Sequence, residues 1–404
     1  MRSMGINPYP AQSSRDEKIE RVVEEFDKFD GERLGLVGRL VGWREHGKVV
    51  FGDLMDETGK LQLFIKEGAM GKTRAEEGFL GFEDLRLVDE GDFVQVRGEI
   101  VKTQTGEISL LVEDLKILSK SLRPLPEKWE GIKDSETRMR KRYLDLLMDE
   151  EKRDRFVRKA KFWQANQRFL EDRGFIKVEV PVLEHVTGGA DARPFETHMN
   201  ALDEEFYLRI STELKQKRLL AAGMEKIYTL GPNFRNEGID DEHLPEYHQV
   251  EWYWAYADYK DNMDFVKEMF RYIAEEVYGK TSFKTRGHEF DLSDEWEEID
   301  YVKVIKEKLG VDIWKDDDEK MLGVINEHGV DLSEGQINKN RLVDNLWKII
   351  RKDISGPAFL VNVPKFMSPL AKEKSDDEKL TERFQVVIAG SELGNGYSEL
   401  NDPV

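Results

Sequence analysis

The chain has 404 residues, with 82 acidic against 62 basic side chains, a formal net charge of −20 and no cysteine. This length provides for two or three packed domains, while the missing thiols exclude thiolate metal sites, catalytic cysteines and disulfides. The negative charge argues against general binding of DNA. Because neither a signal peptide nor an apolar run of the roughly 20 residues of a membrane helix is found, we expect a cytoplasmic protein without membrane association.

The first third of the chain predicts a helix followed by strands. Residues 15–30 place apolar side chains at steps of three and four, with Ser13 or Ser14 as N-cap and Gly31 as a stop, so we expect the segment 1–30 to be helical. Five short β-branched or aromatic runs follow, at 34–44, 48–57, 59–66, 92–102 and 108–118. With a helical stretch at 74–83 after the third strand, this is the element order of an OB-fold β-barrel, which we expect over 31–120.

A linker separates this barrel from the rest of the chain. Residues 121–136 contain Pro124 and Pro126 and no periodicity, which is typical of a linker. Helical patterns then extend over 137–173 and end at Gly174. A second domain is therefore expected from 137 to 404.

The second domain alternates strands and helices. Strands are predicted at 177–183, 205–210, 225–234 and 248–257, with a helix at 212–224, which indicates an α+β domain with antiparallel strands. The acid-rich stretch 260–355 is predicted to be a mostly helical, solvated insertion. Strand patterns return over 359–364 and 384–400.

A predicted hairpin carries the densest polar cluster. Arg235 and Glu237, at a spacing of two, share one face of a strand, as do Glu251 and Tyr253 on the next. An arginine grips a phosphate with paired hydrogen bonds and Tyr247 can stack on a base, so the cluster suits a nucleotide. From spacing alone, a charged hairpin with solvent-facing ion pairs stays an equal alternative.

The same hairpin resembles a known family. Its segments FRNEG, HLPEY and EWYWAYADY resemble the second motif of class II aminoacyl-tRNA synthetases, in the form found in lysyl-tRNA synthetases. The segments GINPYP, RGFIKVEVPVL with Pro181, GGADARPFETHMNALD, STELKQKRLL and ELGNGYSELND resemble further parts of that subgroup, and they extend over nearly the whole chain. The resemblance implies an OB-fold anticodon-binding domain followed by a class II catalytic domain built on an antiparallel sheet.

The resemblance implies a lysine–tRNA ligase that activates lysine with ATP to lysyl-adenylate and transfers it to tRNA(Lys). By similarity, Arg235 would contact the α-phosphate as the catalytic residue, Glu237 the adenine amino group and His243 the distal phosphates, while Tyr247 would stack on the adenine. Without the motif, a loop histidine with no special role is the less favoured alternative for His243.

The resemblance also implies a lysine pocket. Carboxylates are natural acceptors for an ammonium group. Glu399 would receive the substrate ammonium with help from Tyr253, and the other implied residues are Gly189, Glu213, Glu251 and Asn395. Taken alone, Glu213 is an ordinary acidic residue at a helix N-terminus.

Two related activities are less favoured. Aspartyl and asparaginyl enzymes need cationic or amide partners where this chain has Glu213 and Gln216, and a carboxylate there repels aspartate. Relatives that attach lysine to proteins lack the barrel.

In the barrel, the resemblance implies that Phe51 stacks on an anticodon base while Gln62 and Glu107 offer polar groups to base edges.

Local positive charge is expected in the first strands of the barrel despite the acidic total. It comes from basic side chains at Arg33, Arg39, Arg44, Lys48, Lys60 and Lys66.

The resemblance implies a homodimer as well, since the first class II motif forms the dimer interface in the family.

Two departures from the family pattern concern ATP and Mg²⁺. No GxGxGxDR run, the third class II motif, is found, and the chain stops where the family has roughly 80 or more further residues, about half a domain. The catalytic domain is therefore expected to be incomplete, and a truncated relative that binds tRNA or lysine without catalysis is the alternative. Glu392 keeps one magnesium position, but Gln385 replaces a glutamate, which predicts a weaker second site.

Overall fold

The computed structural model describes residues 1–125, 134–240, 243–332 and 337–402. The chain divides into two compact units, Met1–Arg153 and Asp154–Val404, and each is described by itself. Within the described residues, no helix has both the length and the apolar character that crossing a bilayer requires.

The N-terminal segment is less helical than predicted. A 3-10 turn (Arg2–Met4) precedes α1 (Ile19–Glu24) and α2 (Phe26–Phe29), so the single helix expected over 15–30 is wrong. The chain breaks at Glu25, whose φ of −104° and ψ of 31° are not helical. Neither predicted serine caps the helix. Instead, the carboxylate of Asp56 on the barrel accepts the N–H of Ile19, so tertiary contacts set the start of α1.

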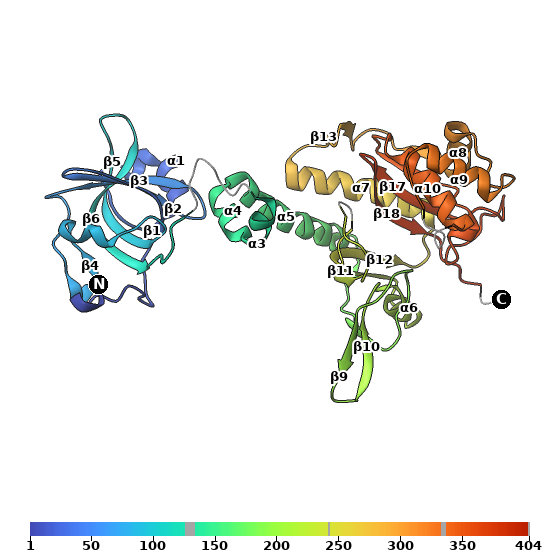
Figure 1. Ribbon diagram of the computed structural model, residues 1–404, viewed down its shortest axis with the longest axis horizontal. Coiled ribbons are helices and arrows are strands. Elements are labelled where there is room, and N and C mark those ends of the chain that lie inside the picture. The colour runs from blue at the N-terminus through green and yellow to red at the C-terminus, as the bar shows by residue number, and fades with distance from the viewer. Residues whose placement is uncertain (126–133, 241–242, 333–336, 403–404) are drawn as a thin grey trace. The chain divides into compact units, whose positions relative to one another are not determined.

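The barrel of the first unit is confirmed as an OB fold. Its strands are β1 (Arg33–His46), β2 (Val49–Met55), β3 (Lys60–Lys66), β4 (Phe79–Leu80), β5 (Phe93–Lys102) and β6 (Ile108–Ser119). The sheet order is β3-β2-β1-β5-β6-β4, and β3 also pairs with β6 in parallel, which closes the barrel (Figure 1). Alternate residues such as Leu36, Leu54, Leu63, Val96 and Val112 are fully buried inside it.

The connection between the third and fourth main strands differs from the predicted helix at 74–83. It consists of two 3-10 helices, η2 (Ala75–Glu77) and η3 (Phe82–Leu87), on either side of β4. Gly78 ends η2 at a φ of +83°, and β4 then pairs with β6. Barrel packing thus replaces a regular helix here.

Two short helices and a long one follow the barrel. They are α3 (Ser135–Arg140), α4 (Arg142–Met148) and the long α5 (Glu150–Asp172). The side chain of Asp134 caps α3 by accepting the N–H of Thr137. Of the linker predicted at 121–136, residues 126–133 lie outside the described residues, and α3 begins inside its last part.

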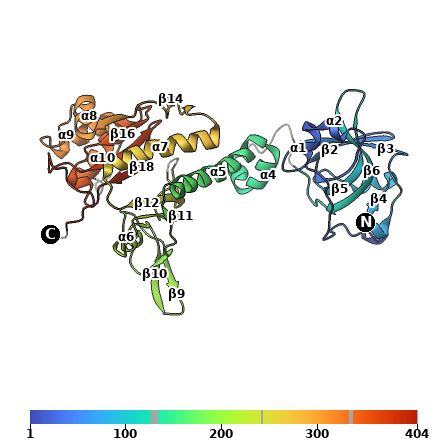
Figure 2. The ribbon, with the colours of Figure 1, turned by 180° about the vertical axis from the view of Figure 1, so that it is seen from behind.

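Two small sheets open the second unit. Their elements are β7 (Ile176–Lys177), β8 (Leu183–Glu184), β9 (Glu196–Met199), β10 (Glu204–Leu208), α6 (Glu213–Ala221), β11 (Lys226–Phe234) and β12 (Glu246–Trp254). The orders are β8-β10-β9 and β12-β11-β7, and the β9–β10 hairpin projects from the rest of its unit (Figures 1 and 2). The single strand predicted at 177–183 is wrong: its two ends pair with different sheets as β7 and β8.

A four-stranded sheet forms the other half of this unit. Its order is β15 (Glu297–Asp300), β16 (Ala358–Val361), β17 (Arg383–Ile388) and β18 (Ser391–Tyr397). Helix α7 (Tyr259–Tyr278) lies along β17 and β18 and buries Met263 and Val266 against Phe384, while its Phe265 packs on Phe169 beneath β12 (Figure 2). One helix therefore supports both sheets.

The stretch 260–355 is not a solvated insertion, contrary to the prediction. After a hairpin of β13 (Ser282–Thr285) and β14 (His288–Asp291), it forms α8 (Tyr301–Leu309), α9 (Asp318–Glu327) and α10 (Lys339–Arg351). Their apolar faces enclose a core around Trp347, with fully buried Ile305, Met321 and Leu346. The acidic residues that dominate the sequence line the outer faces, where Asp317 caps α9.

Candidate active site

The β11–β12 hairpin arranges the candidate residues along one face. In the antiparallel register, Glu251 lies opposite Thr229 and Tyr253 opposite Ile227, while Tyr247 lies opposite Asn233. Because side chains at a spacing of two share a face, Tyr247, Glu251 and Tyr253 all line the same side of the sheet. Arg235 follows directly after β11, and its backbone N–H bonds the carbonyl of Pro245.

Glu251 is held by three hydrogen-bond donors. Its Oε2 accepts the Thr212 hydroxyl at 2.9 Å and the Gln249 amide at 3.2 Å, and its Oε1 accepts the Tyr253 hydroxyl at 3.0 Å. Burial raises the pKa of Glu251, whereas the hydroxyls of Thr212 and Tyr253 lower it. The pKa of Tyr253 is raised well above its ordinary value by burial and by the neighbouring carboxylates, so this phenol stays a donor.

A buried chain of polar side chains lies behind Glu251. The amide of Gln216 donates to Thr212 at 3.0 Å and to Thr229 at 3.2 Å, and the two threonine hydroxyls lie 3.1 Å apart. Gln216 is fully buried, and its Oε1 has no protein partner. Since the Gln216 amide and the Thr229 hydroxyl both donate to Thr212, the Thr212 proton is directed to Glu251.

Two further carboxylates, those of Glu213 and Glu399, lie near the face that carries Glu251. Glu213 begins α6, Glu399 follows β18, and the Nζ of Lys217 lies 2.5 Å from Glu213 and 2.9 Å from Glu399. Tyr397 shares the site with them, and burial with the charges of Glu213 and Glu399 raises its pKa well above the ordinary value. Burial likewise raises the pKa of Glu399, an effect that Lys217 opposes.

Gly189 packs against the start of α6. Its φ of +83° lies in the left-handed region, and a β-carbon there would come within 2.8 Å of the Glu213 Cβ and 2.9 Å of the Ser211 Oγ. Both the backbone conformation and the close approach therefore require glycine. The backbone at Gly189 adjoins the carboxylate cluster.

Arg235 lies over the ring of Tyr247, with its guanidinium carbon 5.4 Å from the ring centroid. Burial raises the pKa of Tyr247. Glu237 is exposed beyond the end of β11, so the hairpin does not bring it onto the face that carries Glu251.

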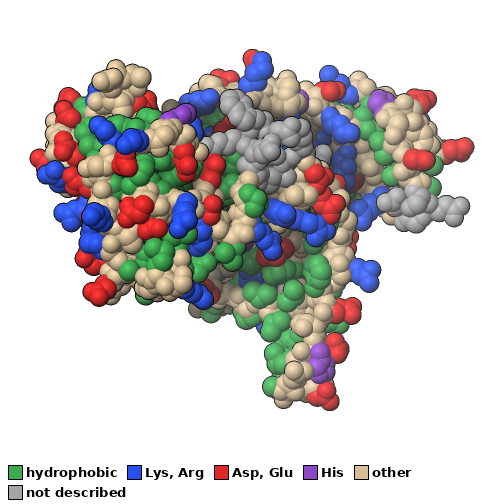
Figure 3. Space-filling model, turned by 60° about the vertical axis from the view of Figure 1, so that its left-hand side comes forward, with side chains coloured by type: hydrophobic (Ala, Val, Ile, Leu, Met, Phe, Trp, Pro, Cys, Tyr) green, Lys and Arg blue, Asp and Glu red, His purple; other side chains and the backbone are tan. Residues whose placement is uncertain are grey.

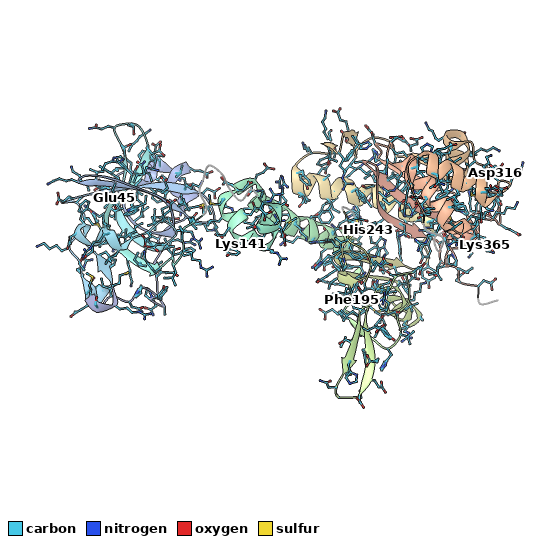
Figure 4. All side chains as sticks on the ribbon, viewed as in Figure 1. Glu45, Lys141, Phe195, His243, Asp316 and Lys365 are labelled. Carbon is cyan, nitrogen blue, oxygen red and sulfur yellow. The ribbon has the colours of Figure 1, made fainter. Side chains whose placement is uncertain are left out.

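His243 is exposed on the loop between β11 and β12 (Figure 4). Its Nδ1 lies 2.8 Å from Oδ1 of Asp240, whose carboxylate also accepts the backbone N–H of His243. Asp240 in turn lines a cavity of about 470 Å³ together with three Lys or Arg side chains and a histidine. The lining residues are Asp240, Arg286, His288, Arg351, Lys352, Ala389 and Gly390.

The two predicted metal ligands lie side by side. Gln385 contacts Oε2 of Glu392 at 3.4 Å, while Oε1 of Glu392 accepts the Trp347 indole N–H at 2.6 Å and lies 3.7 Å from the Nε of Arg351. Within the described residues, no group of three or more His, Asp or Glu side chains is arranged to hold a metal. The carboxylate of Glu392 would suit Mg²⁺, because this ion takes few protein carboxylates and completes its shell with water and phosphate oxygens. Asn395 is exposed on β18.

The predicted base-binding residues lie on the barrel. Phe51 stacks on Phe64 across β2 and β3, with centroids 5.5 Å apart and planes at 13°. Both rings are half-buried and alternate with the interior residues, so Phe51 is not a core side chain. Gln62 accepts the Ser109 hydroxyl at 3.0 Å, and Glu107 is exposed on the β5–β6 turn.

The positive charge expected on the first strands is partly neutralised. Arg33 pairs with Glu113, Arg44 with Asp53 and Lys48 with Glu67. Acidic and basic side chains are also interspersed over the face of the molecule seen in Figure 3. Arg39 instead lies over the ring of Phe93, at 4.3 Å.

Sequence reasoning missed Lys217, Thr212 and Tyr397. Lys217 follows Glu213 by four residues, a spacing that pairs side chains on a helix and could have marked it. The same spacing joins Thr212 and Gln216 and could have marked their bond, but the bond of Thr212 to Glu251 and the place of Tyr397 depend on other elements.

Two known protein families match this chain. Residues 134–404 match the family model of class II tRNA synthetases (D, K and N), and residues 35–118 match an OB-fold nucleic acid binding domain. The protein is thus a class II tRNA synthetase, a class that uses ATP as a substrate.

Its relatives narrow the class. The chain is 43% identical over 410 residues to the lysine–tRNA ligase of Thermotoga maritima, covering all of this chain and 80% of that protein. It is 41% identical to the lysine–tRNA ligase of Thermosipho africanus over 99% of the chain and 79% of the relative, and 39% identical to that of Halalkalibacterium halodurans over 99% and 80%. The chain belongs to the lysine–tRNA ligase family.

Proposed function

We propose that this chain activates lysine with ATP and transfers it to tRNA(Lys). The observation that carries the proposal is the cluster of Glu213, Glu251 and Glu399, brought together from α6, β12 and the segment after β18. A site rich in carboxylates accepts ammonium groups and repels the side chain of aspartate. A diamino acid therefore suits it better than the acidic or amide substrates of related enzymes.

Within this pocket, Glu399 with Tyr253 would bind the ε-ammonium group. Glu213 and Glu251 would lie near the rest of the substrate, and the backbone at Gly189 would approach the α-amino group, a role supported by its close packing on Glu213. Asn395 would help to hold the carboxylate end.

ATP would lie along the other end of the hairpin. The contact of Arg235 with Tyr247 supports a site in which the guanidinium holds the α-phosphate while the ring stacks on adenine. Glu237 would accept the adenine amino group. His243 would meet the distal phosphates, and the basic cavity between Asp240 and Arg351 offers charge for the same groups.

In the proposed reaction, a carboxylate oxygen of lysine attacks the α-phosphorus of ATP, a P–O bond forms, and pyrophosphate leaves. The 3′-terminal ribose of tRNA then attacks the adenylate carbonyl and AMP leaves. Arg235 would stabilise the charge that develops on the α-phosphate, and the hairpin would align the reactants. Mg²⁺ would be held by Glu392, with Gln385 as a weak ligand, and would neutralise phosphate charge.

The barrel would bind the anticodon of the tRNA. The Phe51–Phe64 stack presents an aromatic surface, and its half-exposed position suits stacking on an unpaired base. Gln62 and Glu107 would supply polar contacts to base edges. In this assignment the barrel occupies 31–120 and the catalytic domain 137–404.

We further propose a cytoplasmic homodimer. Apolar side chains on α5 and around β7 and β8 are exposed, including Phe156, Val157, Ile176, Leu183 and Val186. Large apolar side chains left exposed to water in number are typical of an interface. Analytical ultracentrifugation tests the dimer, and a monomer at micromolar concentration would refute it.

The activity is tested by lysine-dependent exchange of pyrophosphate into ATP. We expect exchange with lysine, its loss in Arg235→Ala, and normal exchange in Arg168→Ala, a matched control in which an exposed arginine of α5 paired with Glu276 is removed. Exchange with another amino acid but not with lysine would refute the proposal. Binding of tRNA without any exchange would support a binding module instead.

A further inference from the structure

Lys217 places an ammonium group of the chain itself inside the proposed lysine pocket. Its Nζ bridges Glu213 and Glu399, at 2.5 Å and 2.9 Å. The side chain of Glu213 is 8% exposed and that of Lys217 25% exposed, whereas that of Glu399 is 39% exposed, so the Glu213 end of the bridge is the one shielded from water. Within the described residues, no other basic side chain forms an ion pair with either carboxylate.

The Lys217 bridge offsets the charge repulsion between Glu213 and Glu399. One ammonium group contacts both carboxylates, so Glu213 and Glu399 lie close together. Two like charges at such a distance in a partly buried site repel each other, which favours protonation of one of them when no counter-ion is present. Burial and the charge of Glu213 raise the pKa of Glu399, while Lys217 lowers it.

The titratable side chains of the pocket come from several elements. Helix α6 contributes Glu213 and Lys217, β12 contributes Glu251 and Tyr253, and β18 with the segment after it contributes Tyr397 and Glu399. Burial raises the pKa of both tyrosines far above neutrality, so they carry no charge. Arg209 adds a buried guanidinium whose charge interacts with Glu251, so Glu213, Glu399 and Lys217 together carry one net negative charge, which an ammonium group of lysine offsets.

We infer that Lys217 is a built-in counter-ion of the amino-acid pocket, which keeps Glu213 and Glu399 ionised together so that the pair retains a net negative charge for an ammonium group of the substrate. This inference rests on the proposed function. Lys217 is a positioning residue that acts through the two glutamates, and it does not take part in the chemistry.

The inference predicts a change in proton linkage. In Lys217→Met, one proton would be shared by Glu213 and Glu399 in the empty site. Lysine would have to expel this proton on binding, so its affinity would fall up to about tenfold for each unit of decreasing pH below the raised pKa of the pair. In the wild type Lys217 opposes this protonation, so the pair adds less pH dependence than in the variant.

Calorimetry of lysine binding to the full chain tests this between pH 6 and 8. Titration in two buffers of different ionisation enthalpy counts the protons released. We expect about one more proton released by Lys217→Met than by the wild type near pH 6.5, and wild-type behaviour in Lys217→Arg. Lys215→Met is the matched control, since Lys215 lies on the same helix but faces Glu184 at 3.7 Å.

The double variant Lys217→Met with Glu399→Gln adds an independent measurement. It removes the like-charged pair, so the extra proton release should disappear even if overall affinity is low. Equal proton release in the wild type and Lys217→Met, or persistent release in the double variant, would overturn the inference alone. If the wild-type chain binds no lysine at all, both the proposed function and the inference fail.

Discussion

The hydroxyl of Thr212, the residue before α6, donates to Oε2 of Glu251 on β12 at 2.9 Å. This bond links the helix to the sheet at the proposed lysine pocket. Because Gln216 and Thr229 both donate to Thr212, its own proton has one acceptor, the Glu251 carboxylate.

Thr212→Val should weaken the use of lysine. Loss of one hydrogen bond to a charged group costs about 2 kcal/mol, or roughly 30-fold in KM for lysine, with the KM for ATP unchanged. Hydrogen bonds to a carboxylate favour its charged form, so their loss raises the pKa of Glu251 and the defect should grow as pH falls. Steady-state exchange at pH 6 and 8 measures this. Thr197→Val, on the β9–β10 hairpin, is the control, and equal KM values in both variants would contradict the assigned role.

Gly189→Ala should impair lysine binding through steric conflict. The added β-carbon would lie 2.8 Å from Glu213 Cβ and 2.9 Å from Ser211 Oγ. Gly174→Ala provides a close control, because Gly174 has a φ of +82° but no atom lies within 4 Å of the place that its new methyl group would occupy. Both variants should lose about 1 kcal/mol of stability from backbone strain, measured by urea unfolding. Only Gly189→Ala should also raise the KM for lysine, and a similar KM in the two would refute the close-approach argument.

Gln385→Glu should strengthen the proposed magnesium site. The new carboxylate would join Glu392, 3.4 Å from the present amide, and two charged ligands bind a hard cation more tightly than one. We expect the Mg²⁺ concentration for half-maximal exchange to fall severalfold. Gln167→Glu, on α5, should leave it unchanged. No shift in the first variant would argue against a metal between these two positions.

Phe51→Ala should weaken tRNA binding without affecting exchange. Base stacking on an aromatic ring contributes about 1–3 kcal/mol, which corresponds to roughly 5- to 150-fold in Kd. Filter binding with tRNA(Lys) measures this loss. The control is Phe93→Ala, which removes a 40% exposed ring from β5 of the same barrel. Equal losses in the two variants would exclude a specific role for Phe51.

Much of the fold could be predicted from local patterns. The five main strands of the barrel show the alternation that one buried face imposes, and Leu36, Leu54 and Leu63 do point inward. The helix at 15–30 failed because its start depends on Asp56, a residue of the barrel. Likewise, composition described the outer faces of α8 to α10 but not the core around Trp347, because the apolar residues of these three helices meet only in the folded unit.

The candidate site could be predicted mainly from the resemblance to class II synthetases. Spacing alone placed Glu251 and Tyr253 on one face, as the register has them. It also placed Glu237 with Arg235, but the strand ends before both residues and Glu237 is exposed. The contact of Lys217 with Glu399 and the place of Tyr397 depend on how α6 meets the end of β18, which no local pattern reveals.

The contact between Trp347 and Glu392 has a consequence for how the protein tolerates change. Trp347 is almost fully buried among α8, α9 and α10, yet its indole N–H fixes the carboxylate proposed to meet Mg²⁺. Packing within this helical layer therefore sets the orientation of a surface ligand. Substitutions in that core, remote from any substrate, should alter the metal requirement at temperatures where the fold is still intact.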